Sequence, residues 1–73
     1  MPDYPVLSGA EIVKALERLG FAQDRQRGSH IVMKRGTAGY VVPLHREVKR
    51  GTLGNIVRQT SLDAKDFLAA LQH

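Results

Sequence analysis

Two histidines of this 73-residue chain lie among cations, in an arrangement suited to phosphate chemistry. Imidazole exchanges a proton near neutral pH, and His30 follows a Gly28-Ser29 turn in the basic stretch that begins at Arg25. RNA carries its own nucleophile, the 2′-hydroxyl, so its cleavage without a metal needs a proton carrier and cations that hold the phosphate. His30 and its neighbouring arginines supply both. From the residues alone, however, a structural or RNA-contacting role for His30 is favoured over catalysis.

His45 follows Pro43-Leu44 at the exit of a predicted strand. It can act as a second proton carrier, a hydrogen-bonding support or a metal ligand, and we favour a structural or phosphate-positioning role. Without cysteine or acidic partners, two histidines make a weak metal site, so we expect no metal and no cofactor. His73 is the terminal residue, where we expect disorder.

The carboxylates are scattered and form no motif. A two-metal nuclease needs carboxylates that converge on cations about 3.5–4 Å apart. We interpret all the acidic side chains as solvated: Asp3, Glu11, Glu17, Asp24, Glu47, Asp63 and Asp66. The absence of cysteine excludes a disulfide framework, a thiolate zinc site, an iron–sulfur cluster and a thiol nucleophile, and it suits a reducing cytoplasm.

The charge balance indicates a polyanionic partner. Eleven Lys and Arg residues face seven Asp and Glu residues, which gives a net charge of +4. Arginine predominates among the cations, and its planar fork matches phosphate oxygens. The side chains that we expect to contact RNA, apart from His30 itself, are Arg25, Arg27, Ser29, Lys34, Arg35, His45, Lys49, Arg50 and Thr52.

The last three of these residues precede a predicted helix, whose free amides and Thr52 hydroxyl can bind an anion. A solvated basic loop followed by an ordinary helix cap explains the same residues equally well. The aromatic residues are too few, and too regularly placed at apolar positions, to form a base-stacking platform.

The first element that positions these residues is an amphipathic helix over residues 9–19. Ser8 and Glu11 form a capping box at its start, and Gly20 suits the left-handed position after its end. The proline-bearing residues 1–5 before it show no secretory signal pattern, and we interpret them as a short extended leader.

Three strands follow, predicted at residues 21–26, 30–34 and 40–43 and joined by short turns. Short connections imply an antiparallel meander, and Pro43 marks the end of the third strand. Strand alternation puts His30, Val32 and Lys34 on one face, and the other face of this strand is expected to meet the helices.

Two helices complete the chain. Leu53, Ile56 and Val57 predict a helix of two to three turns after Thr52. Ser61 is the predicted cap of a shorter helix with a buried apolar stripe. The order α-β-β-β-α-α, with the helices on one face of a three-stranded antiparallel sheet, predicts one α+β two-layer domain over residues 1–73, like the double-stranded-RNA-binding fold. The chain has no apolar run long enough to span a membrane.

Taken together, these motifs resemble the HicA family of small toxins, also called YcfA-like proteins, over almost the full length. The resemblance is carried by their order and spacing: Leu7-Ser8-Gly9, Leu19-Gly20-Phe21, the run from Arg25 to His30, Val42-Pro43-Leu44-His45, Gly51-Thr52-Leu53 with Ile56, and Phe67-Leu68. The chain departs from the family at Gln59-Thr60-Ser61-Leu62, where such proteins often have Ala-Gly-Leu-Ser. This departure affects the junction before the last helix.

The resemblance implies a double-stranded-RNA-binding-like fold and a cytoplasmic, ribosome-independent endoribonuclease that degrades messenger RNA. It also implies a HicB-type antitoxin as protein partner. The family's catalytic histidine, in Gly-Ser-His, falls on His30, which reverses the preference stated above. His45, Gly51 and Thr52 carry over as structural or RNA-positioning residues. The alternative is a non-catalytic RNA-binding module or an inactive relative of the toxins.

Overall fold

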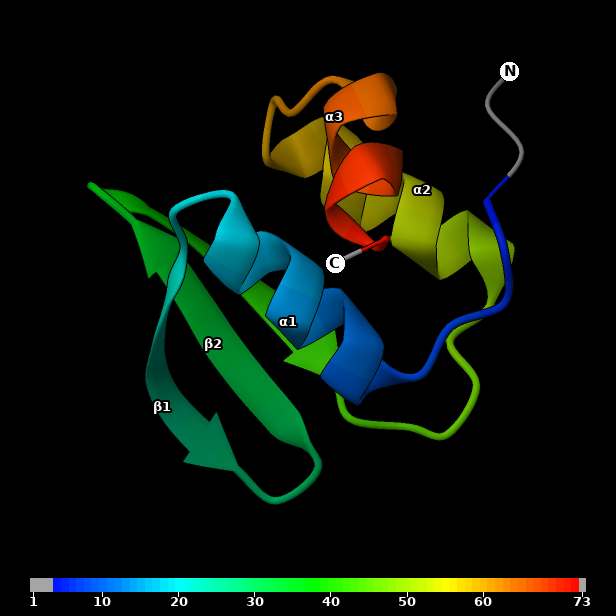
Figure 1. The fold of residues 1–73 in the computed structure, drawn as a ribbon. Coiled ribbons are helices and arrows are strands. Elements are labelled where there is room, and N and C mark those ends of the chain that lie inside the picture. Colours follow the sequence, from blue (N-terminus) through cyan, green and yellow to red (C-terminus); the bar gives the residue numbers. More distant parts are fainter. Residues whose placement is uncertain (1–3, 73) are drawn as a thin grey trace.

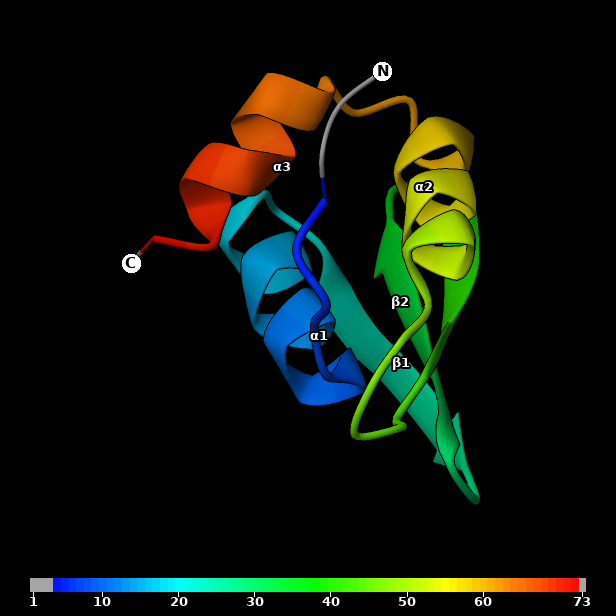
Figure 2. The ribbon, with the colours of Figure 1, turned by 90° about the vertical axis from the view of Figure 1, so that its right-hand side faces the viewer.

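The computed structural model describes residues 4–72, and its elements follow the predicted order. They are α1 (Gly9–Arg18), β1 (Ala22–Arg27), β2 (His30–Arg35), β3 (Ala38–Pro43), α2 (Arg50–Gln59) and α3 (Ala64–Ala70). The strands form one antiparallel sheet in the order β1-β2-β3, and all three helices lie on the same side of it (Figures 1 and 2). The predicted α+β two-layer fold is confirmed. Residues 1–3 of the expected leader and His73 lie outside the described residues.

Both ends of α1 are capped as predicted. The Ser8 hydroxyl accepts a hydrogen bond from the Glu11 amide at 3.1 Å, and the Glu11 carboxylate accepts one from the Ser8 amide at 3.0 Å. The hydrogen bond from the Ser8 backbone amide, together with the nearby Ser8 side chain, lowers the pKa of the Glu11 carboxyl. At the other end Gly20 has a φ of 96°, and the amides of Gly20 and Phe21 bond back to carbonyls in the last turn of α1. This Schellman arrangement turns the chain from the helix into β1.

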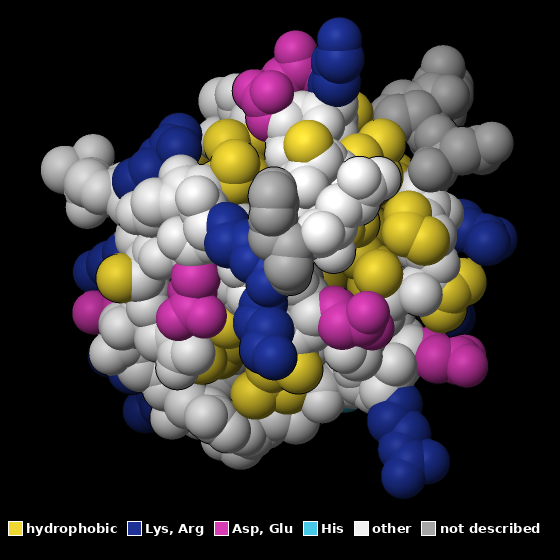
Figure 3. Space-filling model, viewed as in Figure 1, with side chains coloured by type: hydrophobic (Ala, Val, Ile, Leu, Met, Phe, Trp, Pro, Cys, Tyr) yellow, Lys and Arg dark blue, Asp and Glu magenta, His cyan; other side chains and the backbone are white. Residues whose placement is uncertain are grey.

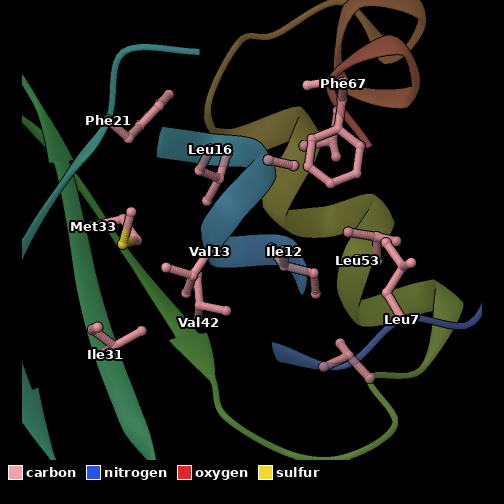
Figure 4. Close-up of a cluster of buried hydrophobic side chains, with 14 residues drawn as sticks. Leu7, Ile12, Val13, Leu16, Phe21, Ile31, Met33, Val42, Leu53 and Phe67 are labelled. Carbon is pink, nitrogen blue, oxygen red and sulfur yellow. The ribbon is translucent and has the colours of Figure 1, made fainter. Parts of the chain in front are cut away.

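The core lies between the helices and one face of the sheet. On the sheet side, Ile31, Met33 and Val42 pack toward α1 (Figure 4). On the other side of α1, Phe67 of α3 is fully buried in the same cluster. The packing fixes the sheet against α1, and hence the strand ends that carry the histidines.

Burial alternates along β2 as predicted. Ile31 and Met33 are buried, whereas His30 and Lys34 are exposed and Val32 is half-buried. The register of the pairing is therefore the one that places His30 on the face of the sheet away from the helices.

The third strand is longer than predicted, since it begins at Ala38 and not at Tyr40. Ala38 pairs with Arg35, which leaves a two-residue loop of Gly36 and Thr37 between β2 and β3. Gly36 has a φ of 62°, and this positive angle at the first loop position is typical of a tight type II′ hairpin turn.

The predicted starts of the last two helices were wrong. α2 begins at Arg50 with Lys49 as its N-cap residue, so Thr52 lies within the first turn and does not cap it. Ser61 does not cap α3, because it adopts a left-handed φ of 59° in the turn after α2. Asp63 caps α3, and its carboxylate accepts a hydrogen bond from the Lys65 amide at 2.9 Å.

The N-terminal segment lies along the helical layer. Leu7 forms an isolated antiparallel bridge with Val48, and the Arg50 guanidinium donates to the Tyr4 carbonyl at 2.7 Å. The Tyr4 ring also packs edge-on against Phe67, at 6.3 Å between centroids. Within residues 4–72 no helix has the length and apolar character needed to cross a membrane.

Candidate functional site

The turn before His30 places this side chain at the first position of β2. Gly28 and Ser29 form the two-residue loop between β1 and β2, and Gly28 has a φ of 54°. The Gln26 side-chain amide donates to the Gly28 carbonyl at 3.1 Å and braces the loop. A two-residue turn with glycine first is the type II′ hairpin, in which the next residue begins the strand directly. His30 is thus held opposite Arg27 of β1.

His45 is placed by three backbone constraints at the exit of β3. Pro43 lies opposite His30 in the sheet register. The Leu44 amide donates to the Ser29 carbonyl at 2.6 Å, and the Gly9 amide of α1 donates to the His45 carbonyl at 2.9 Å. Ser29 and Leu44, the residues that precede the two histidines, are therefore joined by a hydrogen bond, which ties the two histidine-bearing segments together.

Gly9 allows the start of α1 to meet this strand exit. A Cβ atom at Gly9 would lie against the Pro43 carbonyl oxygen, 2.9 Å from the Pro43 carbonyl carbon and 2.7 Å from the Leu44 Cα. No side chain fits at such distances from backbone atoms. From the sequence, Gly9 was expected only as the first residue of the helix, with no tertiary contact. The available signal was the glycine itself, because alanine is the better helix former at an unconstrained position.

The two imidazole rings lie near one another in an edge-to-face arrangement, one at the start of β2 and the other beyond the end of β3. Their centroids are 6.1 Å apart, their planes meet at 69°, and both residues are exposed. The pair lies where the β1–β2 turn, the exit of β3 and the start of α1 come together. Sequence reasoning placed His45 near a neighbouring strand's start, and the structure identifies that start as His30.

The face of the sheet away from the helices is predominantly basic. Directly paired residues share a face, and Arg25 is paired with Val32 while Arg27 is paired with His30. These side chains and Lys34 lie on the uncovered face, and Val41, which is 54% exposed, lies on the same face on the edge strand β3. On the helical side, in contrast, Lys and Arg alternate with Asp and Glu (Figure 3).

Lys34 and Arg35 lie at the opposite end of β2 from His30, and both have partners within the protein. The Lys34 ammonium is 3.7 Å from the Asp24 carboxylate, an exposed ion pair that holds the lysine only weakly. The Arg35 guanidinium donates to the Leu19 carbonyl at 3.0 Å and lies 4.8 Å from the centre of the Phe21 ring. Arg35 therefore connects β2 to the end of α1.

Lys49, Arg50 and Thr52 form a separate group at the start of α2. All three are exposed, and the Leu7–Val48 bridge lies between this group and His45 along the chain. Thus the structure brings Arg25, Arg27, Ser29 and the two histidines to one part of the sheet, and leaves the α2 group and Arg35 elsewhere.

The arrangement suits proton transfer at a phosphate more than metal binding. Among residues 4–72, no three His, Asp or Glu side chains come close enough together to hold a metal ion. Exposed imidazoles beside guanidinium groups supply a proton carrier and hydrogen-bond donors for anionic oxygens.

Comparison with known proteins gives a family match. No curated protein matches the chain. The family model described as the HicA toxin of bacterial toxin–antitoxin systems matches residues 9–62. This segment contains α1, the whole sheet, both histidines of the pair and α2. Because the match covers most of the sequence, the chain belongs to the HicA toxin family.

Proposed function

We propose that this toxin is an endoribonuclease that cleaves messenger RNA without a metal, with His30 as a catalytic acid or base. The ribonuclease activity is the one that the family resemblance implies. The observation that carries the proposal is the position of His30: exposed, at the start of β2, and directly opposite Arg27. An RNA phosphate bound by Arg27 is then within reach of the imidazole.

RNA lies, in this proposal, along the uncovered face of the sheet near the β1–β2 turn. Arg25 and Arg27 on the edge strand β1 bind phosphate oxygens, and Ser29 adds a polar group in the turn. Such contacts are made to the RNA sugar-phosphate backbone and do not distinguish one base sequence from another. Lys34 extends the basic surface toward the far end of β2. In the α2 group, Lys49 and Thr52 serve a longer RNA that continues past His45, whereas Arg50 binds this RNA only if it leaves the Tyr4 carbonyl to which it donates.

Arg35 has a different role in this proposal. Its guanidinium already bonds the Leu19 carbonyl and lies over Phe21, so removing it from these partners to bind RNA would cost stability. We therefore assign Arg35 mainly to stabilising the fold, and only secondarily to binding RNA.

The protein partner of the toxin is, in this proposal, a HicB-type antitoxin that covers the histidines and the basic sheet face in the cytoplasm. The exposed Val41 on the edge strand β3 of that face gives a protein partner an apolar contact that a phosphate backbone does not need. Cleavage should therefore stop when the antitoxin binds.

The test compares wild type and His30→Ala on an unstructured messenger RNA in EDTA, after removal of any co-purified antitoxin. We expect cleavage by wild type alone, equal RNA binding by both proteins, and nearly equal thermal melts. Lys14→Ala, which removes an exposed cation from α1, is the matched control and should cleave normally. RNA binding without cleavage by wild type would favour the rival function, a non-catalytic RNA-binding module.

A further inference from the structure

We propose that His45 is a second catalytic residue, which carries the proton opposite to the one moved by His30. This inference rests on the proposed ribonuclease function. It is carried by the geometry of the imidazole pair, which neither the family match nor the sequence spacing supplies: fifteen positions separate the residues along the chain, and the rings lie 6.1 Å apart.

The cleavage step requires proton transfers at two oxygens. One imidazole, in its neutral form, accepts the proton of the 2′-hydroxyl while that oxygen forms a bond to phosphorus. The bond from phosphorus to the 5′-oxygen breaks, and a second, protonated imidazole donates its proton to the departing oxygen. The products are a 2′,3′-cyclic phosphate and a 5′-hydroxyl, and the two histidines end with their protonation states exchanged. No other reactant is needed.

The distance between the two rings is consistent with one histidine acting as the base and the other as the acid. The attacking and departing oxygens lie on opposite sides of one phosphorus atom, so a single histidine does not readily serve both. A proton carrier must come within about 2.6–3.2 Å of its oxygen. Rings whose centroids are 6.1 Å apart are too distant to bond each other directly, and close enough to reach the two sides of one phosphodiester.

The backbone fixes the two histidine-bearing segments relative to one another before RNA binds. Pro43 is paired with His30 at the start of β2, and His45 lies two residues beyond the end of β3 in a segment held by the Leu44–Ser29 and Gly9–His45 backbone hydrogen bonds. Both are exposed, which leaves them accessible to a polymer substrate. Rigid support of this kind is what efficient proton transfer requires.

The test uses His45→Ala and His45→Gln beside His30→Ala, with RNA binding and thermal melts measured for each. Both substitutions at His45 should lower the cleavage rate by about 10²–10⁴-fold, as expected for loss of an acid or base. Glutamine keeps hydrogen bonding but cannot carry a proton, so a rate near that of wild type for His45→Gln would overturn the proposal. RNA affinity should stay within a few fold.

The decisive substrate is an RNA in which sulfur replaces the 5′-oxygen at one linkage. A thiolate leaves without an acid, so this substrate should restore cleavage to the alanine variant that lacks the acid, and not to the variant that lacks the base. Rescue of neither variant, or of both, would contradict the paired roles. Loss of cleavage in His30→Ala with normal cleavage in His45→Ala would refute this inference alone, whereas normal cleavage by His30→Ala would refute the proposed function.

Discussion

Replacing Gly9 by alanine tests whether the start of α1 fixes the histidine-bearing strand exit. The new Cβ would lie 2.7 Å from the Leu44 Cα and against the Pro43 carbonyl, both of which are backbone atoms. Forcing a methyl group into such a contact costs about 1–3 kcal/mol. The hydrogen bond from the Gly9 amide to the His45 carbonyl contributes about 1 kcal/mol, and its loss roughly cancels the better helix propensity of alanine.

The expected net loss for Gly9→Ala is therefore about 1–3 kcal/mol. For a domain of this size, 1 kcal/mol shifts the melting temperature by about 4–8 °C, so the variant should melt about 4–24 °C below wild type. Cleavage should also fall, measured well below the melting temperature of the variant, because a displaced strand exit moves His45 relative to His30.

Gly51→Ala is the matched control for this experiment. Gly51 also lies in the first turn of a helix, and nothing lies within 4 Å of the position of its Cβ. The control should melt at or slightly above the wild-type temperature, since alanine favours the helix by up to about 1 kcal/mol. Equal melting of the two alanine variants would refute the close approach of α1 to the strand exit, and with it our explanation of how His45 is held.

Three further substitutions test the stability and the binding surface. Glu11→Gln should make the melting temperature less sensitive to acid: the pKa of the Glu11 carboxyl is lowered from 4.5 by its bonds to Ser8, so its stabilisation is present above pH 4.5 and is lost as the pH falls through the lowered value. Melting curves of both proteins from pH 3 to 7 would show this, and parallel curves would contradict it. Phe67→Ala should cost about 3–5 kcal/mol by emptying a fully buried site, and a thermal melt within a few degrees of wild type would contradict it. Arg27→Ala should reduce the slope of log RNA affinity against log salt concentration by about 0.7 without lowering the melting temperature. Arg35→Ala should lower the melting temperature with little change in that slope. Filter binding at several salt concentrations, together with thermal melts, checks both variants, and the reverse pattern would refute our assignment of Arg27 to RNA binding and Arg35 to the fold.

The sequence sufficed to predict the layers and the faces of the fold. Capping residues fixed the ends of α1, and the alternation from His30 to Lys34 identified the buried face of β2 correctly. These features depend on residues within a few positions of one another, and such local patterns can be recognised in a single sequence.

The helix starts after the sheet were harder to predict, because several residues compete for the same role. Ser61 and Asp63 are both good caps, and the choice between them depends on the left-handed turn at Ser61. Lys49 precedes α2 with no side-chain cap at all, so the polar signal at Thr52 was misleading. Leu53 is fully buried, so this helix is stabilised by tertiary packing more than by a capping residue.

The candidate site was predicted as a set of residues but not as a geometry. Local patterns identified His30 and its arginines, whereas the distance from His30 to His45 depends on pairing between strands distant in sequence. The contact of Gly9 with Pro43 is also tertiary, and no local spacing reveals it.

The products of RNA cleavage test the central claim most directly. Wild type and His30→Ala would be incubated in EDTA with one RNA oligonucleotide, and the fragment ends identified by mass spectrometry. Our proposal predicts fragments with a 2′,3′-cyclic phosphate and a 5′-hydroxyl from wild type, and no fragments from His30→Ala. Fragments that end in a 5′-phosphate, or the same cyclic products formed at equal rates by His30→Ala, would contradict it.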